Sequence, residues 1–261
     1  MARRGATIFV LIVSLLHGLA GEVAATDAGQ AFGPAGAQVQ FFDRAFSPDF
    51  VATADDSLPG EAPRPVKIFF RVSELGHLVV VSGKVVAADI FVSLGSPPFD
   101  VAIPNGRFPV RLAVLQGSMG RGRVTFARVD LSDVPAVRWA PAYPEGHRRD
   151  VENPNEAAGY EVSSGLGAFF DPEAGKAALA AIETNDDLLE AWLDEGQIRG
   201  MREKGSSGFR LVKDSGPANI VVFDTGWGDG TYATWVGYDA AGNPVTLLTD
   251  FDVLDWSKVT E

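Results

Sequence analysis

Four aspartates occupy positions at which a carboxylate is not the simplest residue for building a sheet or a turn: Asp89, Asp171, Asp229 and Asp250. Asp89 interrupts a long apolar run, and an unpaired buried charge there would be strongly destabilising. Its side chain is therefore expected either to be hydrogen-bonded at a strand end or to have a functional role. Two carboxylates whose pKa values are pushed apart can serve as acid and base, as in glycoside hydrolysis. One hypothesis is thus a hydrolase that uses paired aspartates.

A glycine-rich segment, DTGWGDGTY, offers two further kinds of chemistry. Asp229 lies between two glycines, where it either hydrogen-bonds the amides of its own turn or projects towards a ligand. Asp224 and Asp229, together with carbonyl groups of the turn, have the oxygen ligands that calcium prefers. Trp227 and Tyr232, with Trp235 beyond them, are candidates for contact with a glycan if their rings are exposed, and core residues if they are not.

Asp171 also has a structural explanation. It ends a second glycine-rich segment and precedes Pro172 and Glu173, so it is expected to cap a helix. The alanine-rich run to Glu183 continues that helix, and a second helix is predicted from Asn185. The second helix has an apolar stripe at helical spacing, which predicts packing against the core. The stripe consists of Leu188, Leu189, Trp192 and Leu193.

Alternating or continuous apolar runs predict strands before and after these helices. The predicted strands cover residues 66–72, 78–81, 85–92, 107–116, 124–131, 137–140, 219–223, 231–238 and 245–251. Ser82-Gly83-Lys84 and the loop that begins at Asp239 predict two hairpins. The pattern indicates one α+β domain over residues 66–261, a predominantly antiparallel sandwich or partly open barrel with a two-helix insertion.

Two regions fall outside this pattern. Residues 26–65 are rich in alanine, glycine, proline and aspartate, which predicts a flexible N-terminal segment. Its parts 26–37 and 52–65 are expected to be a flexible linker or a loosely docked arm. Between these parts, Val39-Gln40-Phe41-Phe42 is apolar enough to form a short strand or a docking segment. Residues 141–158 have no periodicity, which is typical of a loop that is either functional or mobile.

The N-terminus has the pattern of a secretory signal peptide over residues 1–25. Arg3 and Arg4 precede a short apolar run, and small residues up to Ala25 offer a cleavage site. The alternative is an uncleaved anchor, but the run is well short of the ~20 residues that span a bilayer. No later segment is long and apolar enough to cross a membrane. The mature chain is therefore expected to be exported, to the periplasm or beyond.

Composition narrows the function further. The chain carries 22 basic and 34 acidic residues, a formal charge of −12, so a nucleic-acid partner is not expected. It has no cysteine, and only His77 and His147 follow the signal peptide, which disfavours a zinc site. No nucleophile elbow, phosphate-binding loop, EF-hand or dinucleotide fingerprint is present.

Three segments together resemble a bacterial family, the domain of unknown function 4241. They are a Ser-Gly-Lys hairpin followed by Asp89, a glycine-rich segment that ends in Phe-Phe-Asp at Asp171, and the Gly-Trp-Gly-Asp-Gly segment closed by Asp250-Phe251. The similarity runs from about Leu75 to Leu254. Val162-Ser163-Ser164-Gly165 stands where an aspartate often precedes the glycine. The resemblance implies a shared domain and no particular activity.

Two functional hypotheses remain. The first is a binding or interaction module of the cell envelope or extracellular space, with a glycan or a protein as its partner. The second is the hydrolase, acting through paired aspartates or an oxygen-ligated metal such as calcium. The sequence contains no recognisable set of catalytic residues, and we therefore favour the binding module.

Overall fold

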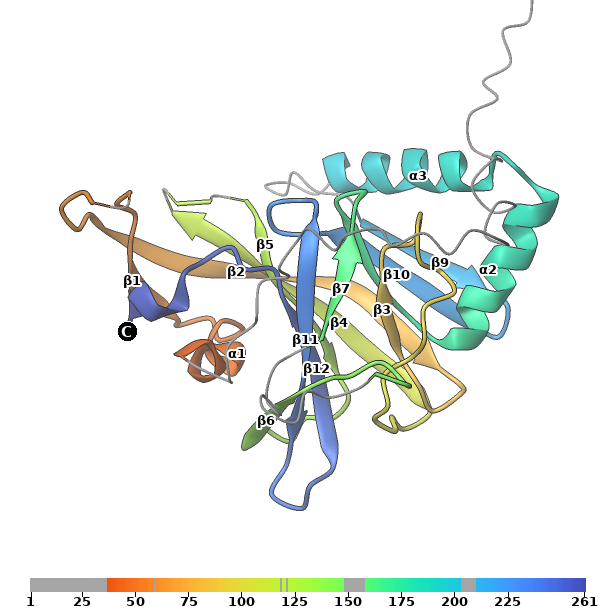
Figure 1. Cartoon of the computed structure of the whole chain (residues 1–261), viewed down its shortest axis with the longest axis horizontal. Helices are drawn as coiled ribbons and strands as arrows, with labels where there is room; N and C mark the ends of the chain where they lie inside the picture. The colour runs from red at the N-terminus through yellow and green to blue at the C-terminus, as the bar shows by residue number, and fades with distance from the viewer. Residues whose placement is uncertain (1–36, 59, 118, 121, 148–157, 203–209) are drawn as a thin grey trace, which may run out of the picture. The chain divides into compact units, whose positions relative to one another are not determined.

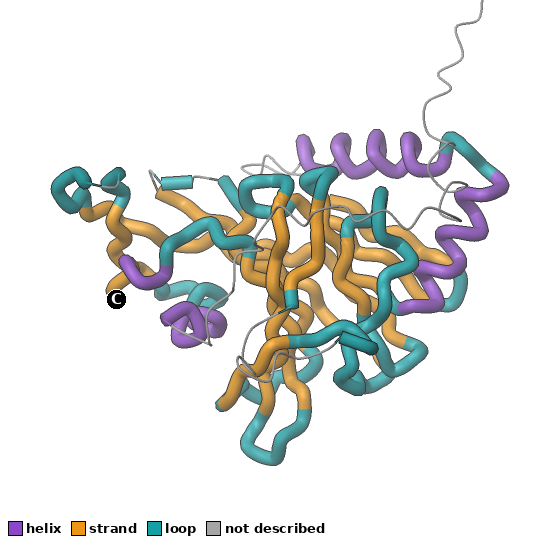
Figure 2. Tube along the Cα trace, in the orientation of Figure 1, coloured by secondary structure: helices purple, strands orange, loops and turns teal. Residues whose placement is uncertain are grey.

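The computed structural model describes residues 37–58, 60–117, 119–120, 122–147, 158–202 and 210–261, whose strands form two antiparallel sheets (Figure 1, Figure 2). The larger sheet has the order β13 (Val259–Thr260), β1 (Val51–Asp55), β2 (Pro65–Val80), β4 (Gly106–Gly117), β5 (Val124–Asp130), β12 (Pro244–Asp250), β11 (Gly230–Tyr238) and β6 (Arg138–Pro141), and β7 (Gly159–Val162) also pairs with β11. The smaller sheet has the order β3 (Val86–Ala88), β8 (Leu166–Phe170), β10 (Ala218–Asp224) and β9 (Arg210–Ser215).

The smaller sheet is buried on both faces. Along β10, Val221 and Phe223 join the core of the larger sheet, whereas Ile220 and Val222 pack with the helices. The buried strand predicted at residues 219–223 is therefore confirmed, because each face of β10 has its own hydrophobic partner.

Helices α2 (Pro172–Thr184) and α3 (Leu188–Arg202) pack against the face of the smaller sheet that is turned away from the larger one (Figure 1). Asp171 caps α2 as predicted, since its side chain accepts a hydrogen bond from the Glu173 N–H. Trp192 is buried in this interface, so the predicted apolar stripe of α3 is core packing. The two antiparallel sheets and the two inserted helices confirm the predicted α+β class.

Residues 37–58 fold onto the larger sheet, so the prediction of a flexible segment is wrong for this part of residues 26–65. The segment contains η1 (Ala37–Gln40), α1 (Phe41–Arg44) and the paired strand β1. Its phenylalanines are buried, and the burial of such large apolar side chains stabilises the docked state. The glycines of residues 26–65 all lie outside this segment, so the composition of the whole region does not describe it. Residues 26–36 lie outside the described residues.

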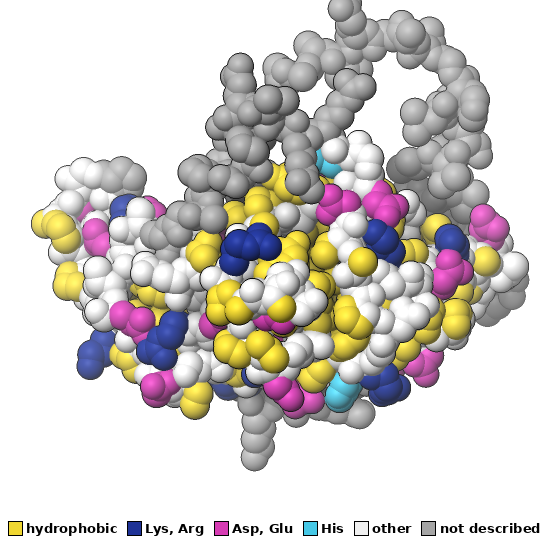
Figure 3. Space-filling model, turned by 90° about the horizontal axis from the view of Figure 1, so that it is seen from below, with side chains coloured by type: hydrophobic (Ala, Val, Ile, Leu, Met, Phe, Trp, Pro, Cys, Tyr) yellow, Lys and Arg dark blue, Asp and Glu magenta, His cyan; other side chains and the backbone are white. Residues whose placement is uncertain are grey.

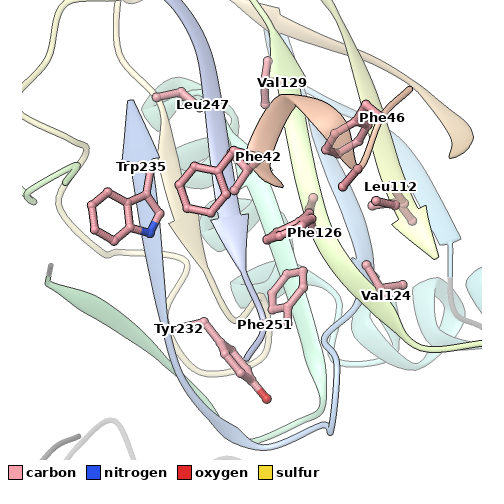
Figure 4. Packing of buried hydrophobic residues seen from close by; sticks show 14 of the residues in the cluster. Phe42, Phe46, Leu112, Val124, Phe126, Val129, Tyr232, Trp235, Leu247 and Phe251 are labelled. Atoms are coloured by element: carbon pink, nitrogen blue, oxygen red, sulfur yellow. The ribbon is translucent and has the colours of Figure 1, made fainter. Parts of the chain in front are cut away.

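The residues predicted to be a strand or a docking segment are helical and docked. Phe42 lies against Phe126 and Trp235, with ring centroids 5.6 Å and 5.7 Å apart (Figure 4). Trp256, from η2 (Trp256–Lys258) near the C-terminus, stacks on Phe126 and Phe41 with centroids 5.1 Å and 5.0 Å away. Segments from both ends of the domain therefore cover the same face of the larger sheet.

The hairpin predicted at Ser82-Gly83-Lys84 is wrong. β2 pairs with β1 and β4 in the larger sheet, whereas β3 pairs with β8 in the smaller one. The chain turns between the two sheets instead, with Gly83 at a φ of +74°. All residues of β3 are buried, so this strand gains more from pairing inside the smaller sheet than from returning along β2.

The hairpin predicted after Tyr238 is confirmed as the antiparallel pair of β11 and β12. Part of the predicted loop at residues 141–158 is also described. Ala142 and Tyr143 are buried there, and residues 148–157 lie outside the described residues. Among the described helices, none combines the length and the apolar character that a membrane crossing requires.

Candidate functional site

Asp89 links the first glycine-containing segment to the second. It lies at the end of β3 with no exposed surface, and its Oδ2 accepts hydrogen bonds from the N–H groups of Ser163 (3.0 Å) and Ser164 (2.8 Å). Its Oδ1 accepts a further bond from the Phe91 N–H, at 2.9 Å. Both carboxylate oxygens therefore accept hydrogen bonds from backbone N–H groups. The two bonds on Oδ2 stabilise the turn that leads into Gly165.

Asp171 links the same two segments at the other end of the smaller sheet. Besides capping α2, it accepts bonds on Oδ2 from the N–H groups of Val81 (2.7 Å) and Ser82 (2.7 Å) and from the Ser82 hydroxyl (2.9 Å). The side chain is fully buried. Its carboxylate thus holds the end of β2 against the start of α2 and has little capacity left for a substrate.

Thr225 connects the second segment to the third. Its N–H donates to the Gly165 carbonyl at 3.1 Å, and its hydroxyl lies 3.0 Å and 2.7 Å from the carbonyl oxygens of Gly165 and Gly228. The Tyr232 hydroxyl also donates to the Gly228 carbonyl, at 2.9 Å. The three segments that carry the family resemblance are therefore one hydrogen-bonded unit. It includes the loop from Thr225 to Gly228, which we call the Gly loop.

Beside this loop lies a cavity of about 360 Å³, which we call the Gly-loop pocket. It is lined by Gly122, Arg123, Val124, Gly165, Asp224, Thr225, Gly226, Trp227 and Gly228. Trp227 is 57% exposed, and the Arg123 guanidinium lies over its ring, 3.8 Å from the centroid. Arg123 Nη1 also donates to the Gly226 carbonyl at 3.1 Å. Arg123 therefore covers one face of the indole and fixes its orientation.

The other two aromatic candidates are buried. Tyr232 and Trp235 are 4% and 1% exposed, and both belong to the main core. Figure 4 shows the Tyr232 ring beside Phe251, with the hydroxyl directed away from the cluster. Of the three aromatic side chains considered for a glycan, Trp227 is the one that a ligand can reach.

Asp250 is a buried acid at the end of β12. Its Oδ2 accepts a bond from the Trp256 indole N–H at 3.1 Å, and its Oδ1 accepts one from the Asp252 N–H at 3.0 Å. Burial raises the pKa of Asp250 well above its usual range, and the charge of Asp252 raises it further. Loss of surrounding water raises the pKa of Asp252 itself to about 6, although its side chain still reaches solvent. Asp252 also has a φ of +49°, a strained backbone conformation for a residue other than glycine.

These raised pKa values predict a stability that depends on pH. Between about pH 4 and pH 6 the folded state keeps protons that the unfolded chain has already released, so the free energy of unfolding should fall as the pH rises. Asp252→Asn should reduce this fall by on the order of 1 kcal/mol, because solvent screens part of the charge effect. Asparagine tolerates the positive φ. Urea unfolding at several pH values measures the change.

Asp255→Asn is the matched control for this experiment. The Ser257 hydroxyl holds the pKa of Asp255 below its usual value, so this carboxylate stabilises the fold above about pH 4 and loses that effect only in stronger acid. The variant should keep the wild-type slope between about pH 4 and pH 7. A wild-type slope in Asp252→Asn as well would show that Asp252 titrates normally.

The structure does not gather the candidate carboxylates into one site. Asp89, Asp171 and Asp250 each accept hydrogen bonds from a different set of donors, whereas Asp229 is exposed just after the Gly loop. Among the described residues, no group of three or more acidic or histidine side chains could hold a metal ion. Of the two aspartates considered as calcium ligands, Asp224 lines the Gly-loop pocket and Asp229 is exposed just after the Gly loop.

Two residues near the Gly loop were not among the sequence candidates. Arg123 lies in a glycine-rich turn before β5, and no local pattern indicates that it reaches a tryptophan about one hundred residues later in the chain. Asp252 follows Asp250 in the closing Asp-Phe-Asp stretch. Two acidic residues separated by one position are the sequence signal from which an effect of one carboxylate on the pKa of the other could have been predicted.

The comparisons with known proteins agree with the resemblance of these segments. The model of a family described as "Protein of unknown function (DUF4241)" matches residues 78–249. No match was found among curated proteins or among solved structures. The matched range contains Asp89, Asp171 and the whole Gly loop, and it covers more than half of the chain. The chain therefore belongs to the DUF4241 family of proteins of unknown function.

Proposed function

We propose that this chain is an exported binding module that uses the Gly-loop pocket and Trp227 to hold a glycan. The observation that carries the proposal is the indole of Trp227, which is 57% exposed yet held in place by Arg123. Single exposed hydrophobic side chains are common on protein surfaces and occur elsewhere on this one (Figure 3), so exposure alone does not carry the argument. What distinguishes Trp227 is that it lines a cavity and that Arg123 lies over its ring. A ring that is already fixed also binds with a smaller loss of conformational entropy.

The surroundings of the ring favour a glycan. A sugar presents a C–H face and a hydroxyl edge, so it matches an aromatic plane bordered by polar groups. The Gly-loop pocket supplies such groups through the Asp224 carboxylate, the Arg123 guanidinium and the backbone of its glycines. The hydrolase alternative gains no support, because the candidate carboxylates are separately bonded.

Export is part of the proposal and rests on the N-terminal sequence. Arg3 and Arg4, the apolar run after them and the small residues up to Ala25 support cleavage after Ala25. The protein recovered from the exported fraction should then begin at Thr26, which mass spectrometry of the intact chain would show. This material is the sample for the binding experiment.

The test is affinity electrophoresis of the exported protein in gels that contain soluble cell-envelope polysaccharide. The wild type should be retarded, and Trp227→Ala should lose at least about tenfold in affinity, because exposed aromatic anchors carry a large share of binding energy. Val92→Ala removes another exposed hydrophobic side chain, 65% exposed and outside the pocket, and should behave as wild type.

Two results would overturn the proposal. One is equal retardation of wild type and Trp227→Ala, which would remove the indole from the contact. The other is the absence of retardation in any polysaccharide, together with capture of a protein partner that depends on Trp227. Trp227→Ala should unfold at nearly the wild-type temperature, since the ring is more exposed than buried.

A further inference from the structure

A second and larger cavity lies at the opposite end of the β4–β5 hairpin from the Gly-loop pocket. It has a volume of about 820 Å³, and we call it the Arg111 cleft. Its floor is the outer face of β4, β5 and β12, and the segment that follows α1 forms one wall. The lining residues that bear on its chemistry are Glu74, Arg111, Arg128, Asp130, Asp133 and Val134.

Two arginines stand side by side on the floor. Arg111 of β4 and Arg128 of β5 are direct partners in the strand register, an arrangement that is unfavourable for like charges. Both share the carboxylate of Asp130. Arg111 Nε donates to its Oδ2, and Arg128 Nε lies 2.7 Å from its Oδ1, although that N–H is not aligned for a hydrogen bond.

The arginine pair is costly to bury. The Arg128 side chain is only 10% exposed, and burial lowers its pKa. Apolar residues of similar size would stabilise such a sheet position at least as well. The free-energy cost of removing charges from water offsets most of the attraction between the charged partners. Asp43 compensates in part by accepting a bond from Arg128 Nη1 at 3.1 Å. The charges are therefore not explained by stability alone.

The guanidinium of Arg111 retains capacity for a ligand. Of its five N–H donors, only the one on Nε has an acceptor among the described residues. Its side chain is 31% exposed, compared with 10% for Arg128. A guanidinium with its two terminal nitrogens available is suited to bind a carboxylate through two parallel hydrogen bonds.

The rest of the cleft selects among anions. The Phe46 ring lies 4.1 Å from the guanidinium carbon of Arg128 and 5.6 Å from that of Arg111, and with only 7% of its surface exposed it supports the two arginines. The apolar surface that a ligand can reach in the cleft includes Val134, which is 51% exposed. Glu74 and Asp133 are exposed at the rim and repel ligands with several negative charges. These features favour one carboxylate attached to an apolar body over a phosphate.

We propose that the Arg111 cleft is a binding site for an apolar monocarboxylate, held by the terminal nitrogens of Arg111 with its body against Val134 and the other apolar residues of the lining. The site is separate from the Gly-loop pocket and does not depend on the function proposed for it. Its volume is within the range of small-molecule sites.

The test uses phenylacetate and its neutral isostere phenylacetamide as probes. Titration of each into the full-length mature protein is followed by NMR or calorimetry. Phenylacetate should bind the wild type in a saturable way and phenylacetamide at least about tenfold more weakly, since only the former is charged. Arg111→Gln should weaken phenylacetate binding by a similar factor. Arg138→Gln removes an arginine that stacks on Tyr238 outside the cleft and should leave binding unchanged.

Arg111→Lys keeps the charge beside Asp130 and serves if Arg111→Gln does not fold. It should bind phenylacetate several-fold more weakly than wild type, because an ammonium cannot form the two parallel hydrogen bonds. The proposal is overturned if phenylacetate fails to saturate the wild type, if the amide binds equally well, or if folded Arg111 variants bind like the wild type.

Discussion

Asp171→Ala is expected to lower the free energy of unfolding by about 4 kcal/mol, because it leaves several buried donors without their acceptor. These donors are the N–H groups of Val81, Ser82 and Glu173 and the hydroxyl of Ser82. Asp171→Asn should cost less, about 2 kcal/mol, since its amide oxygen can still serve the Val81 and Ser82 donors while the helix cap is lost. Urea unfolding followed by circular dichroism measures both values.

Asp229→Ala is the matched control for this series. Asp229 is exposed, and no hydrogen bond to its carboxylate is formed by the described residues, so its removal should change the free energy of unfolding by no more than about 0.5 kcal/mol. If Asp171→Ala proved as stable as wild type, the hydrogen bonds around Asp171 would not support the fold. The carboxylate would then be free for the acid–base chemistry considered for it from the sequence.

Gly226→Ala is expected to lower the free energy of unfolding by about 3 kcal/mol, because the added methyl group has no space. A Cβ at this position would lie 2.7 Å from both Cβ and the carbonyl oxygen of Phe251, and 2.9 Å from a methyl group of Val253. Phe251 cannot easily move, since its N–H donates to the Thr125 carbonyl at 3.0 Å and its ring packs on Tyr232. The loop that presents Trp227 would have to shift instead.

Gly228→Ala separates this clash from backbone strain. Gly228 has a φ of +102°, but nothing lies within 4 Å of an added Cβ. Its replacement should therefore cost only the conformational penalty, about 1–2 kcal/mol. Thermal and urea unfolding of the two variants give the comparison. Equal destabilisation would mean that strain alone, and not contact with Phe251, keeps glycine at position 226.

The cap at Asp171, the apolar stripe of α3 and the β11–β12 hairpin all follow from interactions between residues close in sequence. Such interactions depend on spacing, which can be read without knowing the fold. The same reasoning predicted a hairpin at Ser82-Gly83-Lys84 and failed there, because the partner of β3 is β8, some eighty residues later. A glycine turn shows that the chain bends but not which strand it meets next.

Residues 37–58 illustrate a second limit. The glycine- and proline-rich composition of residues 26–65 as a whole predicts flexibility, yet Phe41 and Phe42 are buried against aromatic rings from β5, β11 and the C-terminal segment. The stabilisation comes from apolar surface supplied by distant parts of the chain, which local composition does not contain.

The sequence by itself determined the family, the α+β class, the helix cap and the segments in which the acidic and aromatic candidates lie. Only the tertiary structure decided what those residues do. It placed Asp89 and Asp171 on backbone amides of other segments, buried Tyr232 and left Trp227 exposed under Arg123. It also brought Arg111 and Arg128 together on one sheet. The physical reason is that burial, charge pairing and hydrogen-bond partners depend on which strands become neighbours, and that choice is made by the whole core at once.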